Sequence, residues 1–221
     1  MTQQIIVNSR TIDILAVLML ITTIMLIGTS RLKTCIWAYA FRSFTLTLVS
    51  GLIACFSGIH HIYITTVITL ALKVIVIPGF LFYIVKKINI REELESYVNY
   101  TVSLFLACGI ILIAFYSTQT IIQSENTLMR HCLPIALSIT LLGFFVMISR
   151  KQAITQILGL ITMEDGMFFA ALSTSYGMPL IVELGLFFDI LVSVIIMGIY
   201  VYRIKESFDT IDTDFLKELK E

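Results

Sequence analysis

Several acidic and basic side chains of this 221-residue chain lie inside long apolar segments. Lys73 is near the middle of the apolar run 62–85, the pair Glu164-Asp165 near the middle of 153–173, and Asp189 near the middle of 179–202. If these segments cross a lipid bilayer, an ionisable side chain at that depth costs several kcal/mol unless it faces protein, water or an opposite charge. Each of these residues is therefore a candidate functional residue.

Two more ionisable residues lie away from the centres of their segments. Arg42 is about one turn from the middle of 36–56, and Glu183 is about one turn inside the start of 179–202. Glu183 and Asp189 are six residues apart, which is about 9 Å along a helix and about 120° around it. They cannot both face one neighbour directly, although a file of water could join them.

The chemistry that these residue types favour is proton exchange. Carboxylates and ammonium groups in a low dielectric can gain and lose protons near neutral pH, so a base and acids at one depth predict a proton path. The alternative is structural, because buried ion pairs can simply fix how helices pack.

The segments that carry these groups have the composition and length of transmembrane helices. Hydrophobic residues make up 58% of the chain, charged residues 14%, and the mean hydropathy is +0.96, which is typical of membrane proteins. A helix needs roughly 20 apolar residues to cross the hydrocarbon core. We therefore predict an all-α, polytopic membrane protein of about seven transmembrane helices, at about 12–29, 36–56, 62–85, 98–116, 132–148, 153–173 and 179–202.

Basic residues near the segment ends predict the orientation. One side of the membrane would hold only Arg10 and Arg130. The other would hold the basic residues of the first, third and fifth connections and of the start of the tail: Arg31, Lys33, Lys86, Lys87, Arg91, Arg150, Lys151, Arg203 and Lys205. Because cytoplasmic loops are enriched in Lys and Arg, we expect the N-terminus outside and the C-terminus in the cytoplasm.

Other reactive residue types form no recognisable catalytic or metal-binding motif. The cysteines Cys35, Cys55, Cys108 and Cys132 are scattered without a CxxC pair. His60-His61 and His131 lie at segment ends, where interfacial polar residues are expected. A formal net charge of zero argues against nucleic acid as a partner. We expect a non-catalytic polypeptide without cofactors or metal ions.

Two further features concern local structure. Pro78, followed by Gly79, should loosen the third segment one turn past Lys73 and could free carbonyl groups for water, although an ordinary kink explains this pair equally well. The breaks at Ser30-Arg31 and Ser149-Arg150 are alike, and charged residues follow both. Segments one to three and five to seven could therefore form a same-direction repeat.

The sequence around the sixth segment carries a family resemblance. The stretch from Arg150 to Gly166, RKQAITQILGLITMEDG, followed by Val182-Glu183-Leu184-Gly185 and Asp189, resembles component E of the hydrogenase-4 and formate hydrogenlyase group. The resemblance in length and helix number covers the whole chain.

The last three segments, about 132–204, also resemble the K-type subunit of respiratory complex I and the C-type subunit of multisubunit cation/proton antiporters. The K-type pattern has a glutamate directly after a Gly-Leu pair, where this chain has Ile161, and Glu164 follows three residues later. Asp189 best matches the second K-type glutamate.

These resemblances imply a membrane-arm subunit of an energy-converting nickel-iron hydrogenase or formate hydrogenlyase in the inner membrane of a prokaryote. Its partners would be antiporter-like subunits, the subunits that dock a peripheral redox arm, and the lipid bilayer. We expect Glu164 and Asp189 to load and release protons and Lys73 to act as their countercharge. Asp165, Glu183 and Arg42 would complete the path.

The expected organisation has four parts: helices one to three with a cytoplasmic connection (1–97), a linking helix (98–130), a K-type-like unit of three helices (131–204) and a cytoplasmic tail (205–221). Two other functions agree with the same residues. The chain could be a subunit of a multisubunit sodium/proton antiporter without a redox partner, or a non-conducting assembly scaffold.

Overall fold

The fold is a bundle of long helices. The computed structural model describes residues 2–57, 60–88, 96–124, 132–175 and 195. Its elements are α1 (Thr2–Gly28), α2 (Leu32–Ser57), α3 (His60–Thr69), the π-helix η1 (Leu70–Val76), α4 (Ile77–Ile88), α5 (Tyr100–Ser124), α6 (Cys132–Ser149) and α7 (Ala153–Ser175). One isolated β-bridge pairs Ser96 with Arg150.

Six helical spans in the described part of the chain are long and apolar enough to cross a membrane. They are Thr11–Gly28, Leu32–Cys55, Thr66–Tyr83, Tyr100–Gln119, Cys132–Ser149 and Ile154–Thr174. These spans match the first six predicted segments, which confirms the all-α, polytopic class. The seventh predicted segment, 179–202, lies outside the described residues, and so do Glu183 and Asp189.

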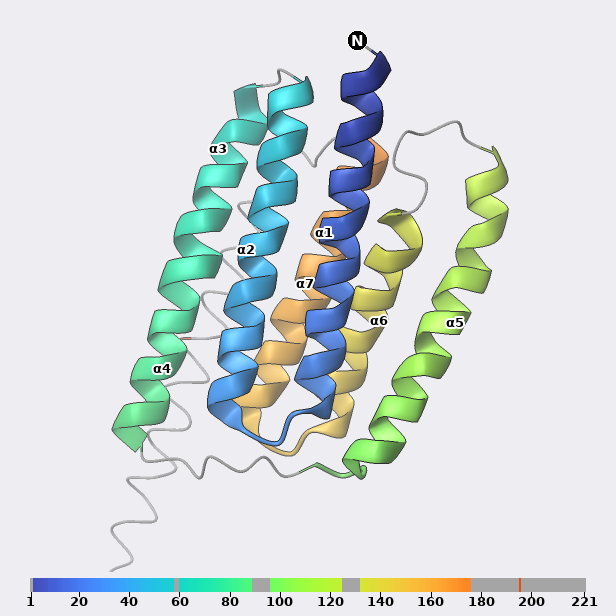
Figure 1. Cartoon of the computed structure of the whole chain (residues 1–221). Helices are drawn as coiled ribbons and strands as arrows, with labels where there is room; N and C mark the ends of the chain where they lie inside the picture. Colours follow the sequence, from blue (N-terminus) through green and yellow to red (C-terminus); the bar gives the residue numbers. More distant parts are fainter. Residues whose placement is uncertain (1, 58–59, 89–95, 125–131, 176–194, 196–221) are drawn as a thin grey trace, which may run out of the picture.

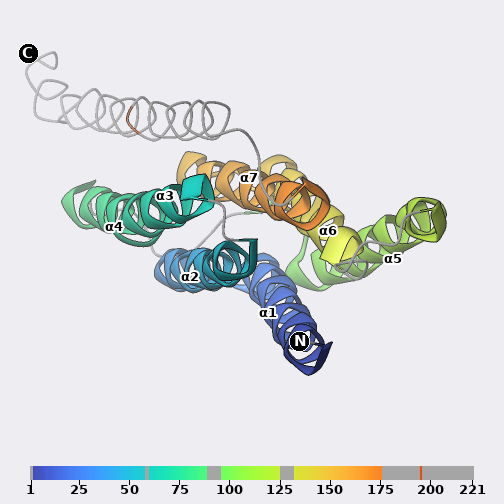
Figure 2. The same cartoon turned by 90° about the horizontal axis from the view of Figure 1, so that it is seen from above.

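The helices stand side by side, with α2 at the centre of the contacts (Figures 1 and 2). Helix α2 packs against α1, α3, η1, α4 and α7, whereas α5 lies at the edge and packs against α6 and α1. Helix α3, η1 and α4 follow one another as a single rod (Figure 1). Residues from α2, this rod and α7 can therefore meet inside the bundle.

Glycines allow α6 and α7 to approach closely. A Cβ atom on Gly159 of α7 would lie 2.8 Å from the Met147 backbone nitrogen and 2.9 Å from the Gly143 carbonyl oxygen of α6. Real Cβ atoms essentially never come so close to backbone atoms, so the contact requires glycine. Small residues serve the same purpose at many interfaces between transmembrane helices. The close contact fixes the position of α7 in the bundle.

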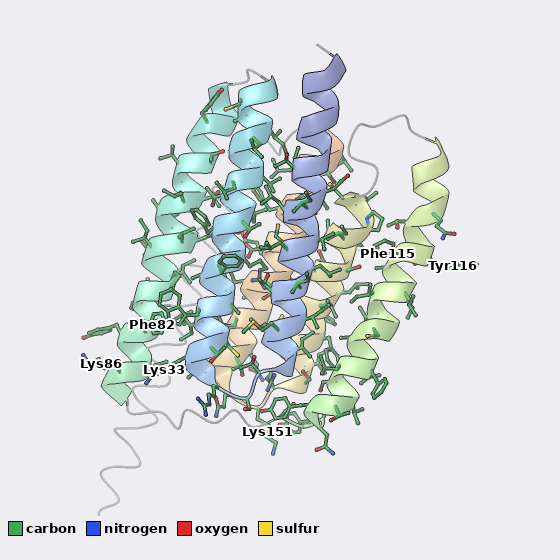
Figure 3. All side chains as sticks on the ribbon, in the orientation of Figure 1. Lys33, Phe82, Lys86, Phe115, Tyr116 and Lys151 are labelled. Atoms are coloured by element: carbon green, nitrogen blue, oxygen red, sulfur yellow. The ribbon has the colours of Figure 1, made fainter. Side chains whose placement is uncertain are left out.

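The basic side chains gather at one end of the bundle. Lys33, Lys86 and Lys151 all lie at the end where α1 and α4 finish (Figure 3). Arg150 is buried at the same end, and its Nη2 donates to the carbonyl oxygens of Ile27 at 2.7 Å and Thr29 at 3.2 Å. Arg150 thus binds the otherwise unpaired carbonyls at the C-terminus of α1, where a cation is favoured.

Candidate functional site

Two apolar clusters form the core, and polar residues lie between them along the helices. One cluster includes Ile36 of α2, Leu81 of α4 and Leu158 of α7. The other includes Val49 of α2 and Phe169 of α7. The segments between these clusters carry the fully buried charges, so the charged residues occupy a layer in the middle of the bundle.

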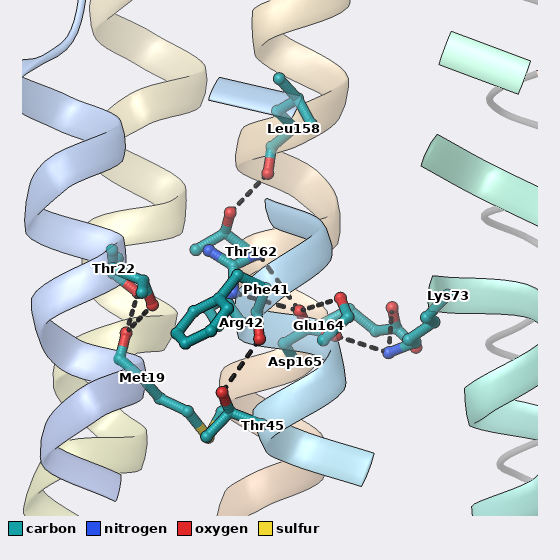
Figure 4. Close-up of polar contacts among 12 residues, drawn as sticks. Met19, Thr22, Phe41, Arg42, Thr45, Lys73, Leu158, Thr162, Glu164 and Asp165 are labelled. Carbon is teal, nitrogen blue, oxygen red and sulfur yellow. Dashed lines mark hydrogen bonds and ion pairs between the residues drawn. The ribbon is translucent and has the colours of Figure 1, made fainter. Parts of the chain in front are cut away.

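Arg42, Lys73, Glu164 and Asp165 meet in this layer (Figure 4). We call these four residues the charged cluster. They come from α2, η1 and α7, and their exposed fractions are 0%, 0%, 5% and 0% in the order given. Two cations and two anions give the cluster a formal charge of zero. Burial of this many charges is tolerable only because each has a partner of opposite charge.

Asp165 is the anchor of the cluster. Its Oδ2 accepts hydrogen bonds from Nε and Nη2 of Arg42, at 3.2 and 3.1 Å, and lies 3.4 Å from the Ser43 hydroxyl. Its Oδ1 accepts from Lys73 Nζ at 2.7 Å. A guanidinium group is not deprotonated in proteins. The pair of Arg42 and Asp165 is therefore an ionic contact between α2 and α7 whose cation keeps its charge.

Lys73 connects the two neighbouring acids. Its Nζ lies 2.8 Å from Glu164 Oε2 and 2.7 Å from Asp165 Oδ1, and 5.7 Å from the centre of the Phe168 ring. Unlike arginine, a buried lysine can lose its proton under the influence of its surroundings. The geometry therefore places the Lys73 ammonium group between two carboxylates.

A stretch of π-helix positions Lys73. It runs from Leu70 to Val76, and the N–H of Ile77 donates to the carbonyl of Leu72, five residues back. Pro78 follows directly, and its missing N–H and its ring disturb the preceding turn of a helix. The sequence predicts loosening one turn past Lys73, whereas the irregular stretch surrounds Lys73 itself. Such π-bulges occur frequently at functional sites.

The structure thus brings together four of the six residues that the sequence singles out. Arg42 belongs to the cluster although its position in the segment is off-centre, because its long side chain reaches Asp165. Sequence reasoning missed the contribution of Ser43, and its position next to Arg42 was the available signal. Glu183 and Asp189 lie outside the described residues. Within the described ranges, no group of three or more His, Cys, Asp and Glu side chains is arranged to hold a metal ion.

Comparisons with known proteins identify relatives of this chain. No family model and no solved structure matches it. It is 33% identical over 153 residues to the uncharacterized protein Rv0085 of Mycobacterium tuberculosis, covering 69% of this chain and 70% of the relative. It is 25% identical over 220 residues to hydrogenase-4 component E of Escherichia coli strain K12 and of Shigella flexneri, covering 100% of each chain.

The full-length match confirms the predicted resemblance to component E, while the likeness of 132–204 to K-type subunits stays a prediction. The six apolar helical spans show that the chain crosses a membrane several times. The chain is therefore a multi-pass helical membrane protein of the same family as the mycobacterial protein Rv0085, and it is similar to hydrogenase-4 component E along its whole length.

Proposed function

We propose that this chain is a non-catalytic membrane subunit of an energy-converting hydrogenase assembly and that the charged cluster handles protons within it. The observation that supports the proposal best is the position of Lys73 Nζ, at 2.8 Å from Glu164 and 2.7 Å from Asp165 in the buried middle layer. Component E, the full-length relative, is named as a hydrogenase component. The redox chemistry belongs to partner subunits, in a prokaryotic inner membrane.

The two acids have different roles in this proposal. Asp165 is tied to Arg42, which keeps its proton, so Asp165 holds the cluster together. Glu164 and Lys73 form the pair that exchanges protons. A proton that arrives on Glu164 leaves the cluster with one positive charge in excess, and this charge favours release of a proton from a neighbouring group. Asp189 and Glu183 would continue the path beyond α7.

The proposal is tested by introducing Glu164→Gln into the assembled complex and measuring proton transfer in sealed membrane vesicles. Glutamine keeps the size of the side chain but cannot take up a proton at working pH. The number of protons moved per electron pair should fall, while electron transfer to an artificial acceptor continues. An unchanged proton yield in a fully assembled complex would overturn the role of Glu164.

Co-purification with nickel-iron and iron–sulfur subunits distinguishes the hydrogenase assembly from an antiporter.

A double variant separates the proposal from the scaffold hypothesis. Lys73→Met combined with Glu164→Gln removes one cation and one anion together, so Arg42 and Asp165 remain as a balanced pair. If the charges only hold helices together, this variant should transport protons normally. If Lys73 and Glu164 exchange protons, the complex should assemble but lose proton transfer.

A further inference from the structure

Thr69, at the end of α3, differs from the other buried threonines of the described helices. Each of the others donates its hydroxyl hydrogen to a backbone carbonyl three or four residues earlier: Thr22, Thr23, Thr45, Thr47, Thr118, Thr155 and Thr162. The Thr69 side chain is 0% exposed, and its Oγ1 has no hydrogen-bond partner in the described part of the chain. A buried polar atom of this kind calls for a partner, usually water.

Thr69 lies between the charged cluster and one end of the bundle. Lys73 is four residues, or about one helical turn, further along the chain. In the other direction, Thr66 is three residues away, and its Oγ1 lies 2.8 Å from the hydroxyl of Ser50 on α2. Thr69 and the Thr66–Ser50 pair therefore follow one another along the rod that carries Lys73, from the cluster towards the end where α2 finishes.

The cluster itself also has an open hydrogen-bonding position. Nη1 of Arg42 is buried and makes no hydrogen bond within the described residues, whereas Nε and Nη2 both bind Asp165. A guanidinium group keeps all its protons in a protein, so each of its buried N–H groups needs a hydrogen-bond acceptor. Water molecules that reach this layer would satisfy both Arg42 and Thr69.

We propose that Thr69 holds water that connects the charged cluster with the end of the bundle where α2 ends and α3 begins. The route passes Thr69 and then the Thr66–Ser50 hydroxyl pair. Each water accepts one proton and releases another, so protons move along the route without net movement of oxygen. The use of this water for proton transfer rests on the proposed function, whereas its presence does not.

Thiol labelling tests the presence of water. Thr69→Cys, Thr66→Cys and Thr23→Cys are introduced separately into the full chain, in its complex and with the four native cysteines replaced. Each is treated with a water-soluble, positively charged methanethiosulfonate. Thr23 is the matched control, since it is equally buried but bonds to the Met19 carbonyl.

Because such reagents attack an ionised thiol in contact with water, the Thr69 and Thr66 variants should react at least about ten times faster than the Thr23 variant. Equal rates at positions 69 and 23 would overturn the proposal. Fast labelling at 69 with slow labelling at 66 would overturn the route, because water would then reach the cluster from elsewhere.

Proton yield tests the use of the route. Thr69→Val keeps the shape of the side chain but removes the hydroxyl, and it should lower the proton yield several-fold, whereas Thr69→Ser should restore it. Thr23→Val should leave the yield unchanged. If Glu164→Gln leaves the yield unaltered while the labelling succeeds, the proposed function fails and the hydrated route stands. If Thr69→Val leaves the yield unaltered, the role of this route in transfer is refuted.

Discussion

Replacement of Arg42 by methionine tests whether the charged cluster stabilises the bundle through paired charges. Methionine keeps the apolar part of the side chain but removes the guanidinium group, so two buried carboxylates are left with only the charge of Lys73. The variant loses two hydrogen bonds, from Nε and Nη2 to Asp165 Oδ2. Hydrogen bonds to charged groups contribute about 1.5–3 kcal/mol each. Removal of one partner of a buried ion pair costs about 3–5 kcal/mol. This cost agrees with the sum expected for the two lost hydrogen bonds.

Equilibrium unfolding by SDS in mixed micelles measures this loss. Trp37, on α2, is the only tryptophan of the chain, and its ring centre lies 5.9 Å from that of Phe82 on α4. Its fluorescence should therefore report the separation of these helices. Arg31→Met is the matched control, because Arg31 is exposed at the end of the bundle. An exposed substitution of this kind should change the free energy of unfolding by less than about 0.5 kcal/mol.

A double variant then identifies the charge as the cause. In Arg42→Met with Asp165→Leu the remaining pair, Lys73 and Glu164, is neutral overall. Replacement of a whole buried ion pair by apolar residues often changes the stability little. The double variant should therefore recover about 2 kcal/mol or more of the free energy of unfolding that Arg42→Met loses. If the effects of the two single substitutions simply add, the reasoning about paired charges is refuted.

Two other predictions concern the packing that positions the cluster. Gly143→Ala should lower the free energy of unfolding by about 1–3 kcal/mol, because the new Cβ would lie 2.8 Å from the carbonyl oxygen of Gly159. Gly109→Ala, with nothing within 4 Å of its Cβ, should not lower it in the same SDS titration. Arg150→Met should lower the thermal midpoint, because it removes the hydrogen bonds to the end of α1. An unchanged midpoint would show that water replaces Arg150 at these carbonyls.

The class of the protein and the positions of its first six helices could be predicted from the sequence alone. Long apolar runs must satisfy their backbone hydrogen bonds internally when they lie in lipid, so each run of about 20 residues predicts a helix. The breaks at Ser30-Arg31 and Ser149-Arg150 correctly marked the helix ends. Lys73 and Glu164-Asp165 were identified because charge in an apolar run is costly. Composition and spacing are local properties, and a sequence carries them directly.

Which charges pair could not be predicted from the sequence, because it depends on how the helices are placed against one another. The contact between Arg42 and Asp165 joins residues 123 positions apart, and depth alone could not show that their side chains face each other. The close approach of α6 and α7 at Gly159 fixes the rotation of α7, and the π-helix fixes that of Lys73. Rotation about a helix axis depends on every neighbour at once. A hydrophobic pattern cannot predict this rotation when the lipid and the protein around a helix are equally apolar.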